Sequence, residues 1–290
     1  MLTGPSDVTA DIADKVLQSN IEAHQLEAPI YDFIHPEIFG SFEQRRIERD
    51  LDLIASAMPK ESVPWALDIG CGTGNLTLKL VKLGFHVRAV DVSSEMLERL
   101  RSKLGSFEAD SVELVKSSAE DVLADSRTYG TWDVITFSSV LHHLPDYEAA
   151  LLHALHQLRP GGILYVCHEP LQKSGPGGGL ASIMLSRILD GLDNLYILTR
   201  KLVIYLIQSW KTGRFQGRTD YTLADLHSKS GIDARKNLEQ LEAAGARVLL
   251  YETYRSRYSW LLASFDSRLG HPEHYHFRFI VQRKDRPVNG

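Results

Sequence analysis

The sequence predicts an α/β protein with a doubly wound, seven-stranded sheet that is mostly parallel and carries a helical cap. Three observations indicate this class. The run W-A-L-D-I-G-C-G-T-G-N at 65–75 joins an apolar strand to an apolar helical run through three alternating glycines. Further apolar strands then alternate with helical patterns as far as residue 170, as in sheets wound from strand–helix units. Two more strand patterns follow residue 245.

The 290 residues are enough for one large domain with additions or for two small domains. The composition, with 43% hydrophobic and 24% charged residues, is typical of a globular protein, and the net charge of −5 argues against a general affinity for nucleic acid. Two cysteines, Cys71 and Cys167, make no disulfide framework and favour a cytoplasmic location. We expect neither a signal peptide nor a transmembrane span, because charges interrupt the apolar run at 180–208.

Residues 1–60 precede the first strand and are expected to form a helical cover. Residues 7–26 and 43–58 carry apolar side chains at helical spacing. Between these two stretches, two prolines and several aromatic residues predict an irregular segment that lies over another part of the molecule.

The glycine loop indicates a ligand site, because glycine lets the backbone approach a ligand and open α/β sheets bind ligands at the carboxyl ends of their strands. Asn75 stands where a dinucleotide fingerprint requires glycine, and no Gly-Lys-Ser/Thr phosphate loop follows. Asp68 places a carboxylate just before the first glycine. The loop therefore suits a cationic ligand better than a phosphate.

The second strand is expected to end at Asp91, where a carboxylate can accept hydrogen bonds from both hydroxyls of a ribose. Ser93 is expected to cap the next helix. The glycines of the run at 159–162 are expected to end the helix before the fifth strand. The six strands after the first are expected at 86–90, 112–115, 132–137, 163–167, 246–251 and 277–282.

The run D-I-G-C-G-T-G, from Asp68 to Gly74, resembles the first motif of the class I S-adenosylmethionine-dependent methyltransferases that act on small molecules. The runs at 117–120 (S-S-A-E), 138–146 (S-S-V-L-H-H-L-P-D) and 158–166 (L-R-P-G-G-I-L-Y-V) resemble later motifs of this family. The resemblance implies S-adenosylmethionine as cofactor and an antiparallel seventh strand. It also implies a Rossmann-like domain at 61–170 and 231–290, with a helical cap inserted at 171–230.

The resemblance assigns the methionine part of the cofactor to Asp68 and the glycine loop, and the ribose to Asp91. The family's frequent aspartate beside the adenine is Ser118 here, so Glu120 or Asp121 is the alternative contact. Tyr31 either matches a tyrosine that covers the cofactor cleft in the family or packs structurally. The candidate cofactor-binding residues are Tyr31, Asp68, Gly70, Cys71, Gly72, Gly74, Asn75, Asp91, Val92, Ser118, Ala119 and Glu120.

His142 and His143 follow the fourth strand, and histidine titrates near neutrality. In the resembling enzymes one histidine of this pair can face the methyl group, so we expect one of them to act as a base or to orient the substrate. The alternative is a histidine that bonds backbone at a helix entry. His168, at the end of the fifth strand, is a third catalytic candidate. The run H-P-E-H-Y-H at 271–276 matches no familiar zinc spacing, so we expect no metal site.

The resemblance implies a methyltransferase that modifies an O, N or C nucleophile of a small molecule, and the apolar and aromatic residues outside the motifs favour an apolar or aromatic acceptor. The cap at 171–230 either covers that acceptor or forms a structural layer. Two other functions stay open. The first is a methyltransferase of the same fold acting on RNA or protein, and the second is a non-catalytic subunit that binds S-adenosylmethionine.

Overall fold

The computed structural model describes residues 5–58, 62–172, 231–255 and 275–284, together with residues 188, 191, 192, 195, 198, 199, 202, 227 and 230. Seven strands in these ranges form one sheet in the order β3-β2-β1-β4-β5-β7-β6. Strand β7 runs opposite to the other six strands of this sheet, which confirms the predicted fold class. The strands are β1 (Trp65–Ile69), β2 (His86–Asp91), β3 (Val112–Lys116), β4 (Trp132–Ser138), β5 (Leu158–Pro170), β6 (Ala246–Tyr254) and β7 (His276–Arg283).

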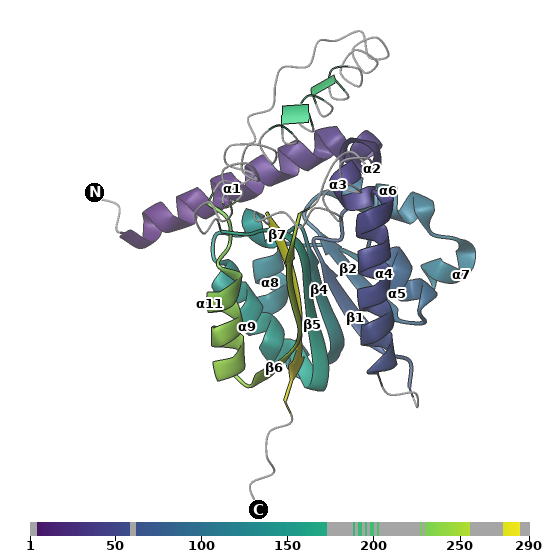
Figure 1. The fold of residues 1–290 in the computed structure, drawn as a ribbon, viewed down its shortest axis with the longest axis vertical. Coiled ribbons are helices and arrows are strands. Elements are labelled where there is room, and N and C mark those ends of the chain that lie inside the picture. Colours follow the sequence, from purple (N-terminus) through teal and green to yellow (C-terminus); the bar gives the residue numbers. More distant parts are fainter. Residues whose placement is uncertain are drawn as a thin grey trace, which may run out of the picture.

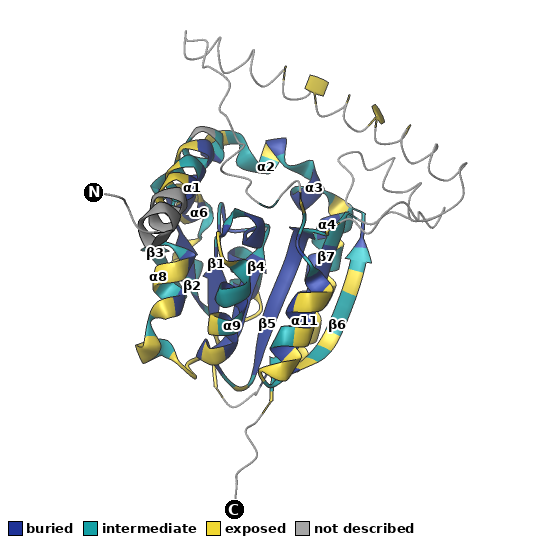
Figure 2. Cartoon of the chain, turned by 90° about the vertical axis from the view of Figure 1, so that its left-hand side faces the viewer, coloured by how far each residue is buried: buried dark blue, intermediate teal, exposed yellow. Residues whose placement is uncertain are grey.

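Helices cover both faces of the sheet (Figure 1). On one face lie α4 (Ser41–Ser56), α5 (Thr77–Lys82) and α6 (Ser94–Lys103), and on the other α8 (Ala119–Ala124), α9 (Tyr147–Gln157) and α11 (Ala234–Ala243). Because both faces are covered, the central strands are buried along most of their length, as the dark strands of Figure 2 show. As predicted, Ser93 caps α6, and its hydroxyl accepts a hydrogen bond from the Met96 backbone at 3.3 Å.

The fifth strand differs from the expectation at its start. Helix α9 ends at Gln157, and the residues expected to cap it instead belong to β5, where Leu158 already pairs with Trp132. Gly162 lies so close to β4 that a Cβ atom there would come within 3.0 Å of the Trp132 carbonyl oxygen. The glycine therefore permits close approach of two strands and does not end the helix.

The N-terminal residues lie across the carboxyl ends of the strands (Figure 1). Helix α1 (Pro5–Glu27) leads through η1 (Ala28–Ile30), α2 (Tyr31–Ile34) and α3 (Pro36–Phe39) to α4. Asp32 accepts hydrogen bonds from the Thr73 hydroxyl in the glycine loop and from the Lys103 ammonium at the end of α6. These contacts fasten the N-terminal segment to the glycine loop and to α6.

His35 lies between α2 and α3 and contacts two carboxylates, with its Nδ1 2.7 Å from Glu37 and its Nε2 3.3 Å from Glu27. Burial lowers the pKa of His35, but the bonds and charges of both glutamates outweigh burial and raise the pKa to about 9. Because the folded pKa lies above the ordinary 6.5, the stabilisation is complete below pH 6.5 and is lost as the pH rises through 9.

We expect His35→Gln to lower the free energy of unfolding by at most about 3 kcal/mol below pH 6.5, and by far less above pH 9. Urea denaturation of the natural protein and of His35→Gln across this pH range measures the difference in their free energies of unfolding. His153→Gln, at an exposed position, is the control. A difference that does not change with pH would contradict the account.

Most of the predicted cap at 171–230 falls outside the described residues, so the cap stays a prediction. Seven isolated described positions there are helical, and the large side chains at five of them are exposed: Ile188, Leu192, Leu195, Leu198 and Leu202. None of the helices in the described ranges has the length and apolar character that crossing a membrane requires.

Candidate active site

A cavity of about 370 Å³ opens at the carboxyl ends of β1, β2, β3 and β4. Helix α1 and Tyr31 contribute one wall, and the turns after the four strands contribute the others. The residues that line the cavity include carboxylates and two histidines but, among the described residues, no lysine or arginine. The ionisable residues that line the cavity are Asp14, His24, Tyr31, Asp91, Glu120, Asp121, His143 and Asp146. Such a lining favours a cation over a phosphate.

The glycine loop lines the cavity through Gly70 and Gly72. Gly70 has a φ of +63°, and a Cβ atom at this position would collide with the Val140 side chain. Only glycine therefore lets the loop pass between β1 and the turn after β4. This close passage exposes backbone to the cavity, as the sequence predicts for this loop.

Three other candidates from the loop lie outside the cavity lining. Cys71 is buried, and burial raises the pKa of its thiol. Gly74 faces the Leu100 side chain of α6, and Asn75 accepts a hydrogen bond from Gln44 of α4 at 3.0 Å. These positions hold the loop against its neighbouring helices.

Asp68 also lies beneath the cavity and does not line it. Its two oxygens accept hydrogen bonds from the Thr77 hydroxyl at 2.5 Å and from the Thr136 hydroxyl at 2.7 Å. Burial raises the pKa of Asp68 to about 6, although both hydroxyls lower it. The carboxylate joins β1 to α5 and β4, so in this structure it positions the glycine loop from below.

Asp91 lines the cavity at the end of β2. Its carboxylate accepts hydrogen bonds from the Gly72 and Ser93 backbone N–H groups, each at 2.8 Å. Burial raises the pKa of Asp91, while the charge of His24 and these N–H groups lower it. The carboxylate is thus fixed between the glycine loop and the start of α6, and α1 brings His24 close to it.

The predicted contacts Tyr31, Val92, Ser118, Ala119 and Glu120 all line the same cavity. The Ser118 hydroxyl caps α8 and accepts a hydrogen bond from the Asp121 backbone at 3.1 Å. The structure therefore brings together both ends of the predicted cofactor site, the glycine loop and the turn after β3.

The two histidines after β4 occupy different surroundings. The His143 ring lines the cavity and lies 5.4 Å from the His24 ring of α1. His142 is buried beside β5, and its Nδ1 lies 2.9 Å from a carboxylate oxygen of Glu169. Their ring centres are 4.0 Å apart, so the pair spans from the cavity to Glu169.

Glu169 is fully buried and accepts three backbone hydrogen bonds from the turn after β4, in addition to the His142 ring. A bulge in β5 between Val166 and Glu169 turns the carboxylate toward this turn. Because an ionised carboxylate only accepts hydrogen bonds, the contact keeps a proton on Nδ1 and leaves Nε2 as the basic atom.

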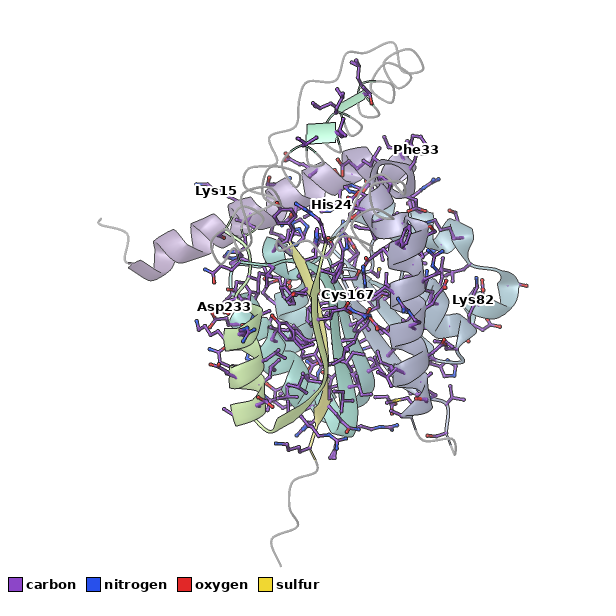
Figure 3. The ribbon with its side chains drawn as sticks, viewed as in Figure 1. Lys15, His24, Phe33, Lys82, Cys167 and Asp233 are labelled. Carbon is purple, nitrogen blue, oxygen red and sulfur yellow. The ribbon has the colours of Figure 1, made fainter. Side chains whose placement is uncertain are left out.

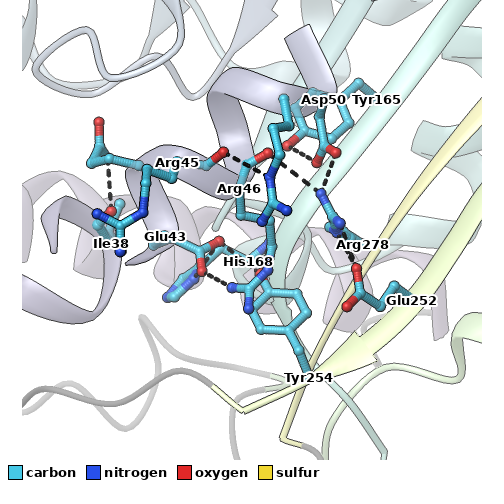
Figure 4. A network of polar contacts seen from close by, with 12 residues as sticks. Ile38, Glu43, Arg45, Arg46, Asp50, Tyr165, His168, Glu252, Tyr254 and Arg278 are labelled. Carbon is cyan, nitrogen blue, oxygen red and sulfur yellow. Dashed lines mark hydrogen bonds and ion pairs between the residues drawn. The ribbon is translucent and has the colours of Figure 1, made fainter. Parts of the chain in front are cut away.

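His168 lies within the same bulge and has a φ of +57°. Its ring is buried outside the cavity, stacked at 4.6 Å on His276, with Nδ1 3.6 Å from Glu43 of α4. Figure 4 shows it in a polar network that connects α4 to the strands. The structure thus separates His168 from the other two catalytic candidates.

The sequence places Glu169 beside His168 at the end of the fifth strand, facing the cleft, but assigns it no role, and it does not single out the α1 residues Asp14, Leu17, Asn20 and His24. One signal was available for α1, because Asn20 is a polar residue within an otherwise apolar helical stripe. The role of Glu169 depends on the β5 bulge, for which the sequence gives no spacing rule. In the described part of the chain, no cluster of three His, Cys, Asp or Glu residues could hold a metal ion.

This sheet order, with a ligand cavity at the glycine loop, defines a Rossmann-like domain. Residues 67–164 match a family model described as "Methyltransferase domain". The chain is 34% identical over 120 residues to a "Ubiquinone biosynthesis O-methyltransferase" of Xanthomonas campestris, a match that covers 40% of this chain and 47% of that protein. A namesake from Xylella fastidiosa is 34% identical over 116 residues, covering 40% and 46%.

A solved structure, a putative sarcosine dimethylglycine methyltransferase from Galdieria sulphuraria, shares the fold with a TM-score of 0.53 at 14% identity, covering 85% of this chain and 86% of that one. Residues 67–164 thus match a methyltransferase domain, which confirms the predicted resemblance to the class I S-adenosylmethionine-dependent methyltransferases. S-adenosylmethionine is the methyl donor of this family. The matched part of the chain spans about half the length of the curated relatives.

Proposed function

We propose that the chain is an S-adenosylmethionine-dependent methyltransferase that modifies a hydroxyl group of a small molecule. One observation carries this proposal: the cavity combines exposed glycine backbone, the fixed carboxylate of Asp91 and an acidic lining without described lysine or arginine. S-adenosylmethionine has a sulfonium and an ammonium but no phosphate, so its chemistry fits this lining. The two free, buried cysteines support a cytoplasmic enzyme.

The residues present would hold the cofactor in a defined direction. Gly70 and Gly72 would face its methionine part, and Asp91 would accept hydrogen bonds from the ribose hydroxyls. Residues 118–120 would lie beside the adenine, and Tyr31 would cover the cleft. When bound, S-adenosylmethionine supplies an electrophilic methyl group on its sulfur. The chain's own task is then to align the acceptor and to receive a proton.

The acceptor's proton would enter the histidine pair at His143, which lines the cavity, and pass on to Nε2 of the buried His142. Glu169 fixes the tautomer and the ring orientation, which is the arrangement of an oriented general base. His143, between His142 and the cavity, would orient the acceptor. A base is needed when the nucleophile carries a proton that must leave, as a hydroxyl does. The base that Glu169 orients therefore supports a hydroxyl acceptor. The name of the relatives, "Ubiquinone biosynthesis O-methyltransferase", supports oxygen as the methylated atom.

The predicted arrangement of domains would complete the enzyme. Residues 1–60 would cover the cofactor, the domain at 61–170 and 231–290 would bind it, and the insertion at 171–230 would enclose the acceptor. The contact of Asp32 with Thr73 supports the covering role of the N-terminal segment.

Calorimetric titration with S-adenosylhomocysteine, the demethylated cofactor, tests the assignment of the site. We expect Asp91→Ala to weaken binding by about 1.5–3 kcal/mol, the value of hydrogen bonds to a charged group. Asp91→Asn, which keeps the shape of the side chain, is expected to lose less. The exposed Asp52→Ala is the control. Unchanged affinity in Asp91→Ala would refute the ribose contact.

A further inference from the structure

The buried face of α1 carries an amide where an apolar side chain would pack. Val16 and Ala23 on this face are 1% and 2% exposed, and Asn20 between them is 7% exposed. Asn20 also lines the cavity, together with Leu17 and His24. Figures 1 and 3 show α1 passing over the carboxyl ends of the strands. The amide therefore faces the ligand site and is shielded from bulk water.

The side-chain oxygen of Asn20 is buried and has no hydrogen-bond partner in the structure. The backbone oxygen of the same residue is occupied, because it lies 2.8 Å from Nδ1 of His24. A buried acceptor without a donor is unfavourable, and native proteins rarely retain one. A donor on the bound ligand would satisfy it.

The surrounding wall indicates which part of the ligand this donor belongs to. The cavity that Asn20 lines is also lined by the turn after β3, which the proposed function places beside the adenine. Its hydroxyl at Ser118 already accepts the capping hydrogen bond of α8, and Ala119 offers no polar side chain. Glu120 and Asp121 are exposed to water. Within the described lining, Asn20 is thus the buried side-chain acceptor that is not already bonded.

We propose that the side-chain oxygen of Asn20 accepts a hydrogen bond from the exocyclic amine of the adenine of the cofactor. Helix α1 then recognises the base and does not merely cover the cleft. The inference rests on the proposed function and adds to it a residue that determines nucleoside specificity. Asp91 has the ribose hydroxyls as its partners, so the amine is the adenosine donor that still requires an acceptor.

Two ligands and two variants test this proposal by calorimetry. The ligands are S-adenosylhomocysteine and its analogue with hydrogen in place of the exocyclic amine. We expect the natural protein to prefer the amine on the order of tenfold. Asn20→Leu is expected to lose this preference and to bind both ligands with the affinity that the natural protein has for the analogue. Gln18→Leu removes an exposed amide from the same helix and is the matched control, with the preference unchanged.

The melting temperature separates this role from a structural one. Asn20→Leu removes an unpaired polar atom from an apolar face, so the melting temperature is expected to hold or rise, and Asn20→Ala provides a smaller second variant. If Asn20→Leu and Asn20→Ala keep the preference for the amine, or if the natural protein has none, the inference is overturned while the proposed function stands. If the natural protein binds neither ligand, both are overturned.

Discussion

Glu169→Ala is expected to reduce the rate of methyl transfer by about 10²–10⁴-fold, the usual contribution of a positioned general base. Without the carboxylate, the His142 ring loses the partner that fixes its tautomer. The substitution also leaves the Val140 and Leu141 N–H groups without their acceptor, which lies at 2.6 and 2.9 Å. Each buried unpaired donor costs about 1–3 kcal/mol, so the free energy of unfolding is expected to fall as well.

Comparing variants separates the two effects of Glu169. Glu169→Gln keeps one acceptor oxygen, so we expect it to retain more stability than Glu169→Ala while still losing turnover. His142→Ala is expected to lose turnover and to keep its affinity for S-adenosylhomocysteine. Steady-state rates and urea denaturation on the same samples measure both. If His142→Ala and His143→Ala both keep the natural rate, methyl transfer depends on alignment alone and the base assignment fails.

Asp50→Ala is expected to lower the free energy of unfolding by about 3–5 kcal/mol, because it leaves the buried Arg278 guanidinium without its inner partner. Figure 4 shows Asp50 of α4 between Arg278 of β7 and the Tyr165 hydroxyl of β5, which donates at 2.8 Å. Burial raises the pKa of Asp50, and the charge of Arg278 opposes this. The pair fastens α4 to the sheet.

Glu252→Ala is the matched control, since Glu252 bonds the same guanidinium at 2.9 Å but has a side chain that is 45% exposed. Water replaces an exposed partner, so its loss is expected to cost less than about 1 kcal/mol. Urea denaturation of both variants gives the comparison. Equal losses from the inner and the outer carboxylate would show that burial does not determine the strength of these pairs.

The fold could be predicted from the sequence because the patterns that specify its elements are local. The apolar strands, the glycine loop at Gly70 and the cap at Ser93 each depend on a few neighbouring residues, and all three appear as expected. The start of β5 was predicted wrongly because Gly161 and Gly162 suit a helix end and a close strand approach equally well. Only the pairing of Leu158 with Trp132 distinguishes the two.

The site was less predictable, because sequence spacing does not show on which side of a loop a residue lies. Asp68 and Asn75 belong to the same motif as Gly70, yet they bond to threonines and to α4 outside the cavity. Asn20 and Glu169 are far from the glycine loop in sequence. They reach the site only through the path of α1 and through the β5 bulge, which are tertiary features.

Mass spectrometry of acceptors incubated with the protein and S-adenosylmethionine carrying a deuterated methyl group tests the central claim most directly. The incubation would contain a mixture of small hydroxylated molecules, with RNA and protein in parallel samples. We predict that a small molecule gains the labelled methyl group on oxygen, that an equal amount of S-adenosylhomocysteine forms, and that Asp91→Ala slows both. Label found only in RNA or protein, or no transfer of label at all, would contradict the account.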